Sequence, residues 1–212
     1  MWLLVSVADA ADAVAAVEGG ADIIDAKDPT RGALSPVSGP TLTAIIAAVR
    51  GRRPVSAALD EHSDGAFGTV DRLPRIAFVK VSTPRPMPGR ALVLAAYADG
   101  RWEHVIEMAA QCGAQGVLLD TGDKNGPGLF RLLSEEKIGE WVEAAHEAGL
   151  VAALAGRLTA DDLPRAAVLG ADIAGVRGAA CEGGRGGRVS VERVRALASV
   201  ARRAPGGVAA GM

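Results

Sequence analysis

The sequence predicts a (β/α)8 barrel, and three observations lead to that fold class. Short apolar runs, often rich in β-branched residues, recur through the 212-residue chain. Ala-rich segments with the apolar spacing of amphipathic helices lie between them. The apolar runs number eight. A doubly wound open sheet also alternates strands with helices, but it usually has about five to seven strands, so the count favours the closed barrel.

The expected elements follow these runs in order. The expected strands are Leu3–Val7, Asp22–Ala26, Val55–Leu59, Ile76–Val81, Leu92–Ala96, Gly116–Asp120, Val151–Ala155 and Asp172–Val176. The expected helices are Ala8–Glu18, Val37–Arg50, Arg101–Cys112, Ser134–Ala148, Ala160–Leu169 and Ser190–Arg203. Helix ends support this assignment, because Thr159 precedes the acidic Asp161 and Asp162, and because Gly149 and Gly170 suit left-handed caps.

Two connections are short for a barrel. Asp60–Arg75 has room for at most a short helix, and Ser82–Arg90 contains three prolines and no helical pattern. We expect one flank of the barrel to lack a covering helix and to pack against a second copy of the chain, as a homo-oligomer. Residues 1–203 are expected to form one domain, and the Gly-rich residues 204–212 a flexible tail.

Composition excludes several function classes. The net charge is -2 and aromatic residues make up 3% of the chain, which argues against nucleic-acid binding. No segment has the length and apolar character of a membrane span. Two cysteines, Cys112 and Cys181, form no disulfide framework, so a reduced cytoplasm is expected. The three histidines, His62, His104 and His146, lack metal-ligand spacing, and no metal site is expected.

Lysines are scarce: the chain has 19 Arg and only four Lys. Lys27, Lys80, Asp120 and Arg177 lie at or near the carboxyl ends of the four even-numbered strands. Catalytic groups of (β/α)8 barrels lie at that end of the strands, and inward side chains of alternate strands share a layer. These four charges are therefore expected to meet in one polar layer at the mouth of the barrel.

The alternation of side chains along a strand adds Asp25, which shares a face of its strand with Lys27. A lysine at such a mouth forms an imine with a carbonyl compound when burial and a neighbouring cation lower its pKa. Lys27 and Lys80 are the candidates, with Asp25 and Asp120 to handle protons. Position alone leaves open which lysine is the nucleophile.

Glycine-rich turns follow the last two expected strands, at the place where barrels commonly bind phosphate. Glycines let the backbone N–H groups approach an anion, and an arginine adds charge-assisted hydrogen bonds. The candidate phosphate-binding residues are Gly156, Arg157, Arg177, Gly178, Ala179, Gly183 and Gly184. Arg185 and Arg188 are further cations on the second turn. The residues alone therefore predict a Schiff-base enzyme acting on a phosphorylated carbonyl compound.

Several segments together resemble the (5-formylfuran-3-yl)methyl phosphate synthase family, which makes the furan of methanofuran-type cofactors. They are LLVSV at 3–7, GGADIIDAKDPTRGAL at 19–34, FVK at 78–80, LLDTGDKNG at 118–126, ALAG at 153–156 and DIAGVRGAACEGG at 172–184. The resemblance runs from about residue 3 to residue 200 and implies a (β/α)8 barrel. It implies an enzyme that joins two molecules of glyceraldehyde 3-phosphate, with loss of phosphate and water.

The resemblance also implies roles. Lys27 matches the family's Schiff-base lysine and Lys80 its proton-transferring lysine, while Asp25, Asp120 and Lys124 match polar positions at the same mouth. No metal or organic cofactor is required. The chain departs from the family pattern after Lys80, where STPRPMPGR replaces a helix, and at the turn after ALAG, where an arginine stands in place of a small residue.

Two other functions fit the residues. A class I aldolase acting on a sugar phosphate would share the imine lysine and the phosphate loops but would stop at the aldol product. A sugar-phosphate-binding barrel without catalysis would share the loops alone.

Overall fold

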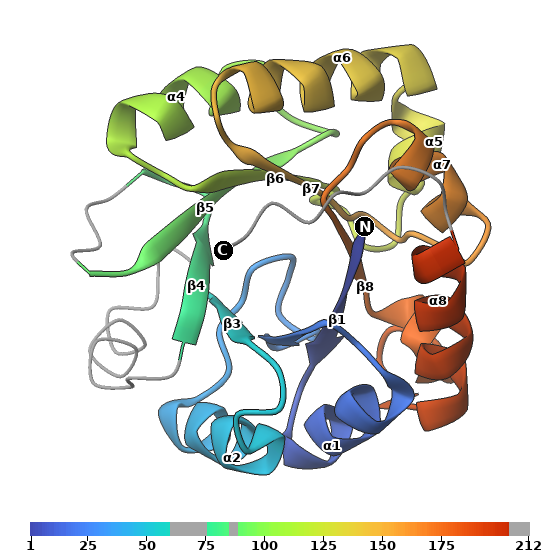
Figure 1. Ribbon diagram of the computed structural model, residues 1–212. Helices are drawn as coiled ribbons and strands as arrows, with labels where there is room; N and C mark the ends of the chain where they lie inside the picture. The colour runs from blue at the N-terminus through green and yellow to red at the C-terminus, as the bar shows by residue number, and fades with distance from the viewer. Residues whose placement is uncertain (60–75, 85–88, 204–212) are drawn as a thin grey trace.

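The computed structural model describes residues 1–59, 76–84 and 89–203. Eight parallel strands close into a barrel in chain order, as the sequence predicts (Figure 1). The strands are β1 Trp2–Val7, β2 Ile23–Ala26, β3 Val55–Ala58, β4 Ile76–Val81, β5 Ala91–Tyr97, β6 Gly116–Asp120, β7 Val151–Leu154 and β8 Ile173–Val176. Pairing of β1 with both β2 and β8 closes the cylinder.

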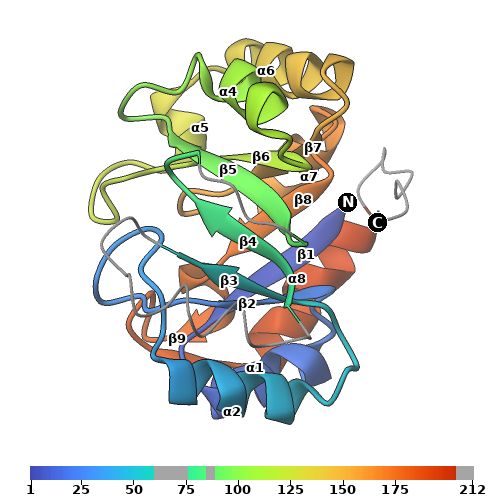
Figure 2. The ribbon, with the colours of Figure 1, turned by 90° about the vertical axis from the view of Figure 1, so that its left-hand side faces the viewer.

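Helices pack against much of the outside of the barrel (Figure 2). They are α1 Ala10–Gly19, α2 Gly39–Val49, α4 Val105–Cys112, α5 Leu129–Leu132, α6 Glu135–Glu147, α7 Asp162–Val168 and α8 Val191–Arg203. Their ends follow local chemistry, since the side chains of Asp9 and Ser134 accept the N–H groups of Asp12 and Lys137 at the starts of α1 and α6. Gly149 and Gly170, with φ of 73° and 85°, follow α6 and α7 as expected.

The structure departs from the expected elements in two places. A short helix, α5, precedes α6, and the turn after β8 contains a 3₁₀ turn, Gly178–Ala180, and a small hairpin of β9 Cys181–Glu182 and β10 Arg188–Val189. The described residues between β4 and β5 form no helix, in agreement with the short connection predicted there. The expectations for residues 60–75 and 204–212 fall outside the described residues, and the homo-oligomer stays a prediction.

Two apolar layers lie inside and outside the cylinder. The inner layer contains Ile23, Phe78 and Leu118, whereas their sequence neighbours pack outward against the helices. This alternation points Asp25, Lys27, Lys80 and Asp120 into the barrel, as expected from the sequence. Several inner positions are small. They include Ala58, Ala95, Ala153 and Gly175, of which Ala153 and Gly175 line a space along the barrel axis that no side chain fills.

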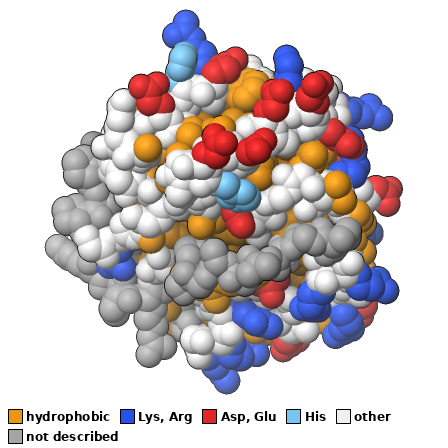
Figure 3. Space-filling view, turned by 45° about the horizontal axis from the view of Figure 1, so that its top comes forward, with side chains coloured by type: hydrophobic (Ala, Val, Ile, Leu, Met, Phe, Trp, Pro, Cys, Tyr) orange, Lys and Arg blue, Asp and Glu red, His pale blue; other side chains and the backbone are white. Residues whose placement is uncertain are grey.

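The outer surface is mostly polar. On α6, Ile138 and Trp141 pack inward, while its exposed face is acidic, with Glu136, Glu140 and Glu143. Figure 3 shows such acidic side chains gathered on the face turned toward the viewer. Within the described ranges, no helix combines the length and apolar character needed to cross a membrane.

Candidate active site

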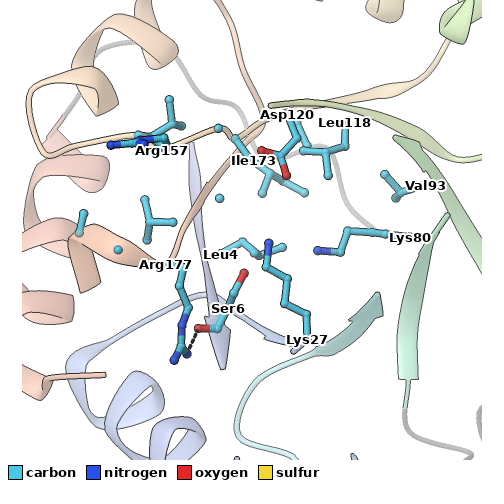
Figure 4. Close-up of a pocket in the computed structure, with 18 of the residues that line it drawn as sticks. Leu4, Ser6, Lys27, Lys80, Val93, Leu118, Asp120, Arg157, Ile173 and Arg177 are labelled. Carbon is cyan, nitrogen blue, oxygen red and sulfur yellow. Dashed lines mark hydrogen bonds between the residues drawn. The ribbon is translucent and has the colours of Figure 1, made fainter. Parts of the chain in front are cut away.

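A cavity of about 310 Å³ opens at the mouth of the barrel and extends into its incompletely filled axis. Its polar lining includes Lys27, Lys80, Asp120 and Lys124, and its apolar floor includes Leu4 and Phe78. Figure 4 shows Lys27 and Lys80 reaching toward the same part of the cavity, with Asp120 on the neighbouring wall. Three charges of the predicted polar layer, Lys27, Lys80 and Asp120, therefore lie at one place.

Lys80 is tied to Asp25. The Lys80 Nζ lies 2.6 Å from Asp25 Oδ2, and both side chains are buried. The hydroxyls of Ser6 and Ser56 donate to the two oxygens of the same carboxylate at 2.9 and 2.8 Å. Burial raises the pKa of Asp25, but the charges of Lys80 and Lys27 outweigh it and hold that pKa below its usual value. Asp25 is therefore an ionised anchor beneath the cavity.

Lys27 has a different environment. It follows β2 directly, only 6% of it is exposed, and its Nζ has no hydrogen-bond or ion-pair partner among the described residues. Burial lowers the pKa of Lys27 to about 7. The charge of Asp120 raises this pKa and the charge of Lys80 lowers it, but burial has the largest effect. A substantial fraction of Lys27 is thus a neutral amine near pH 7.

Asp120 forms the second carboxylate of the site. Its Oδ1 accepts from Lys124 Nζ at 2.6 Å and from the N–H of Thr121 at 2.7 Å. Lys124 also donates to the carbonyl of Thr121. Burial raises the pKa of Asp120, but Lys124 and Lys27 outweigh that effect and lower it. Its other oxygen, Oδ2, has no hydrogen-bond partner in the described part of the chain and is available as a proton acceptor.

The glycine-rich turns lie around the same cavity. Gly156, Arg157, Gly178, Ala179 and Gly184 all line it. A Cβ at Gly156, whose φ is 96°, would lie 2.7 Å from a methyl group of Thr121, so the turn requires glycine. Gly183, the remaining glycine of the predicted phosphate site, is not part of the lining.

Arg177 also lines the cavity, but its guanidinium donates to Asp12 Oδ2 at 2.7 Å and to the carbonyls of Ser6, Arg185 and Gly187. Four of its five N–H groups are therefore used within the protein. In Figure 4 its charged end turns away from the lysines toward the Ser6 backbone. Arg177 thus anchors the loop after β8, and its role as a phosphate ligand stays a prediction.

Sequence reasoning missed two residues of the site, Ser6 and Ser56, which hold Asp25. Arg185, named from the sequence only as a further cation, lines the cavity, and the carbonyls of Pro29 and Gly32 fix its guanidinium. Ser6 could have been found from the sequence, because the alternation along its strand places it on the same inward face as Leu4. No grouping of His, Cys, Asp and Glu within the described residues has the arrangement of a metal site.

The fold and the cavity define a (β/α)8 barrel with three lysines and two carboxylates at its mouth. A family model described as 4-HFC-P synthase matches residues 3–83 and 74–198. The chain is 35% identical to (5-formylfuran-3-yl)methyl phosphate synthase of Methanopyrus kandleri, covering 92% of this chain and 97% of that protein. Its identity to the Methanocaldococcus jannaschii synthase is 34%, with 93% and 98% covered. The chain therefore belongs to the 4-HFC-P synthase family.

Solved structures agree on the fold. Phosphoribosyl anthranilate isomerase from Thermotoga maritima superposes with a TM-score of 0.73 at 14% identity, covering 95% of this chain and 98% of that one. The isomerase from Thermus thermophilus gives 0.72 at 16% identity, with 94% and 98% covered. At such identities the likeness concerns the barrel alone.

Proposed function

We propose that this protein synthesises (5-formylfuran-3-yl)methyl phosphate from two molecules of glyceraldehyde 3-phosphate, through an imine on Lys27, in the formation of a methanofuran-type cofactor. The names of its relatives support the product. The observation that carries the mechanism is the contrast between the two buried lysines. Lys80 is held by a carboxylate at 2.6 Å, and Lys27 has none so placed.

The first step is attack of the neutral Lys27 amine on the aldehyde carbon of one triose phosphate. Loss of water from the carbinolamine gives an iminium ion, whose nitrogen accepts the electron pair left when a proton is removed from the adjacent carbon. A pKa of about 7 for Lys27 supports this step, because a large fraction of the amine is neutral, and so nucleophilic, near pH 7.

Two groups are placed to move protons. Asp120 Oδ2 is a free acceptor beside Lys27 and is suited to remove the carbon-bound proton. Lys80 carries a proton into the cavity and is suited to protonate the hydroxyl that leaves as water. The resulting enamine forms the carbon–carbon bond with the aldehyde of the second triose, and dehydration with loss of one phosphate produces the aromatic ring.

The backbone around Gly156, Gly178 and Ala179 is suited to hold a substrate phosphate, with Arg157 adding charge. The apolar floor formed by Leu4 and Phe78 is suited to a furan ring. This division of the cavity supports a phosphorylated substrate that becomes less polar during the reaction.

Incubation of the purified protein with glyceraldehyde 3-phosphate tests the proposal. We expect a furan chromophore in the ultraviolet and free phosphate to accumulate together, and both to be absent with Lys27→Ala. A carbon–carbon-bonded sugar phosphate without furan or free phosphate would instead identify a class I aldolase. Binding without any turnover would identify a sugar-phosphate-binding barrel.

A further inference from the structure

We propose that Arg185 forms a second phosphate site, on the β2 side of the mouth, separate from the backbone site in the turns after β7 and β8. The proposal rests on the proposed function in one respect: two triose phosphates would bring two phosphates into one cavity. Its physical basis is the hydrogen bonding of the arginines that line this cavity.

Arg185 is held along one edge only. Its Nε donates to the carbonyl of Pro29 at 3.2 Å and its Nη2 to the carbonyl of Gly32 at 2.8 Å. A guanidinium has five N–H groups, and the remaining three find no acceptor in the described residues. These three lie along the Nη1 and Nη2 end of the group, which is the fork that binds carboxylate or phosphate through two parallel hydrogen bonds.

The neighbouring Arg177 shows what a structural arginine looks like in this loop. Its Nε and Nη2 are also held by carbonyls, but its Nη1 is occupied by Asp12 and the carbonyl of Ser6. The two arginines line the same cavity and differ in that one has an open fork and the other does not. Arg185 is thus fixed in place, with its binding groups unused.

Charge pairing leads to the same residue. Among the cations that line the cavity, Lys80, Lys124 and Arg177 each pair with a carboxylate within 3 Å. Lys27, Arg157 and Arg185 have no carboxylate ion-pair partner among the described residues, and the two arginines are the ones on the loops. Arg157 lies on the turn after β7, whereas the Arg185 side chain reaches the loop after β2, directly beyond Lys27. Two permanently charged groups on separate loops match two phosphates.

A linear bisphosphate tests the proposal without any chemistry at Lys27. Hexane-1,6-diyl bisphosphate has two phosphates and no carbonyl, and hexyl phosphate is its monophosphate reference. We expect wild-type protein to bind the bisphosphate at least about tenfold more tightly than the monophosphate in calorimetric titrations, the gain typical of a charge-assisted bidentate contact.

In Arg185→Gln that preference is expected to disappear, while hexyl phosphate binds as in the wild type. Arg185→Lys keeps the charge without the fork and should give an intermediate ratio. Arg188→Gln is the matched control, because Arg188 lies on the same loop, is exposed, pairs with Asp9 and does not line the cavity. Retained hexyl phosphate binding shows that the loop of each variant is folded.

Equal binding of the two probes to wild-type protein, or a preference retained by Arg185→Gln, would overturn the second site. Neither result depends on furan formation. If the protein made no furan but showed the bisphosphate preference, the proposed function would fail and the second phosphate site would stand.

Discussion

Lys27 and Lys80 are both buried in the same cavity, yet their surroundings prepare them for different tasks. The hydroxyls of Ser6 and Ser56 fix Asp25, and Asp25 fixes the Lys80 ammonium. That ammonium in turn helps to lower the pKa of Lys27. In the proposed mechanism, one ion pair therefore both supplies a proton and activates the neighbouring amine.

The pH dependence of kcat/KM tests this arrangement. Only neutral Lys27 attacks a carbonyl, so we expect kcat/KM to rise with pH through about 7. Removing the Lys80 charge in Lys80→Gln stabilises protonated Lys27 and moves the rise to higher pH, in addition to lowering the rate. Removing the Asp120 charge in Asp120→Asn moves it to lower pH. Lys137→Gln, on the surface of α6, serves as the control, and unshifted profiles in both site variants would contradict this account.

The lysines were predictable from the sequence because strand alternation and strand ends are local properties. Asp25 was predicted as well, but its bonds to the hydroxyls of Ser6 and Ser56 were not, since these residues come from three strands and meet only through the barrel register. The anchoring of Arg177 by Asp12 was not predictable for the same reason. Its partner Asp12 is 165 positions away in the sequence and lies on α1.

At the scale of elements, Asp12 joins α1 to the loop after β8. Its carboxylate is buried and accepts from Arg177 Nη1, from the N–H of Ala8 and from the N–H of Val189. Arg177 then holds the carbonyls of Arg185 and Gly187. The glycine-rich loop therefore owes its shape to this ion pair, which explains how a sequence that predicts only an open loop forms the hairpin of β9 and β10.

Asp12→Ala is expected to lower the free energy of unfolding by about 3 kcal/mol, because it leaves the Arg177 charge buried without its partner. Asp9→Ala is the comparison, since Asp9 pairs with Arg188 at the surface and caps α1, and its loss should cost only about 1 kcal/mol. Urea denaturation of both variants measures the difference. Equal losses would show that the buried pair does not hold the loop.

At the scale of the whole molecule, the barrel both positions the charged groups and provides space beneath them. Eight alternating apolar runs and helical segments predicted the closed sheet correctly. The cavity was not predictable, because it depends on which small residues meet on the axis: Ala91, Ala153 and Gly175, which line it, come from three different strands. A fully packed barrel core would leave no room below the lysines for the six-carbon product of the proposed reaction.

The proposed mechanism depends on an imine on Lys27, which borohydride reduces to a stable amine and so traps during turnover. Protein mixed with glyceraldehyde 3-phosphate is reduced, digested and sequenced by mass spectrometry. We expect a reduced triose phosphate adduct on Lys27 of the wild-type protein and no adduct in Lys27→Ala. An adduct on Lys80 or Lys124, or furan production with no trapped lysine, would contradict this mechanism.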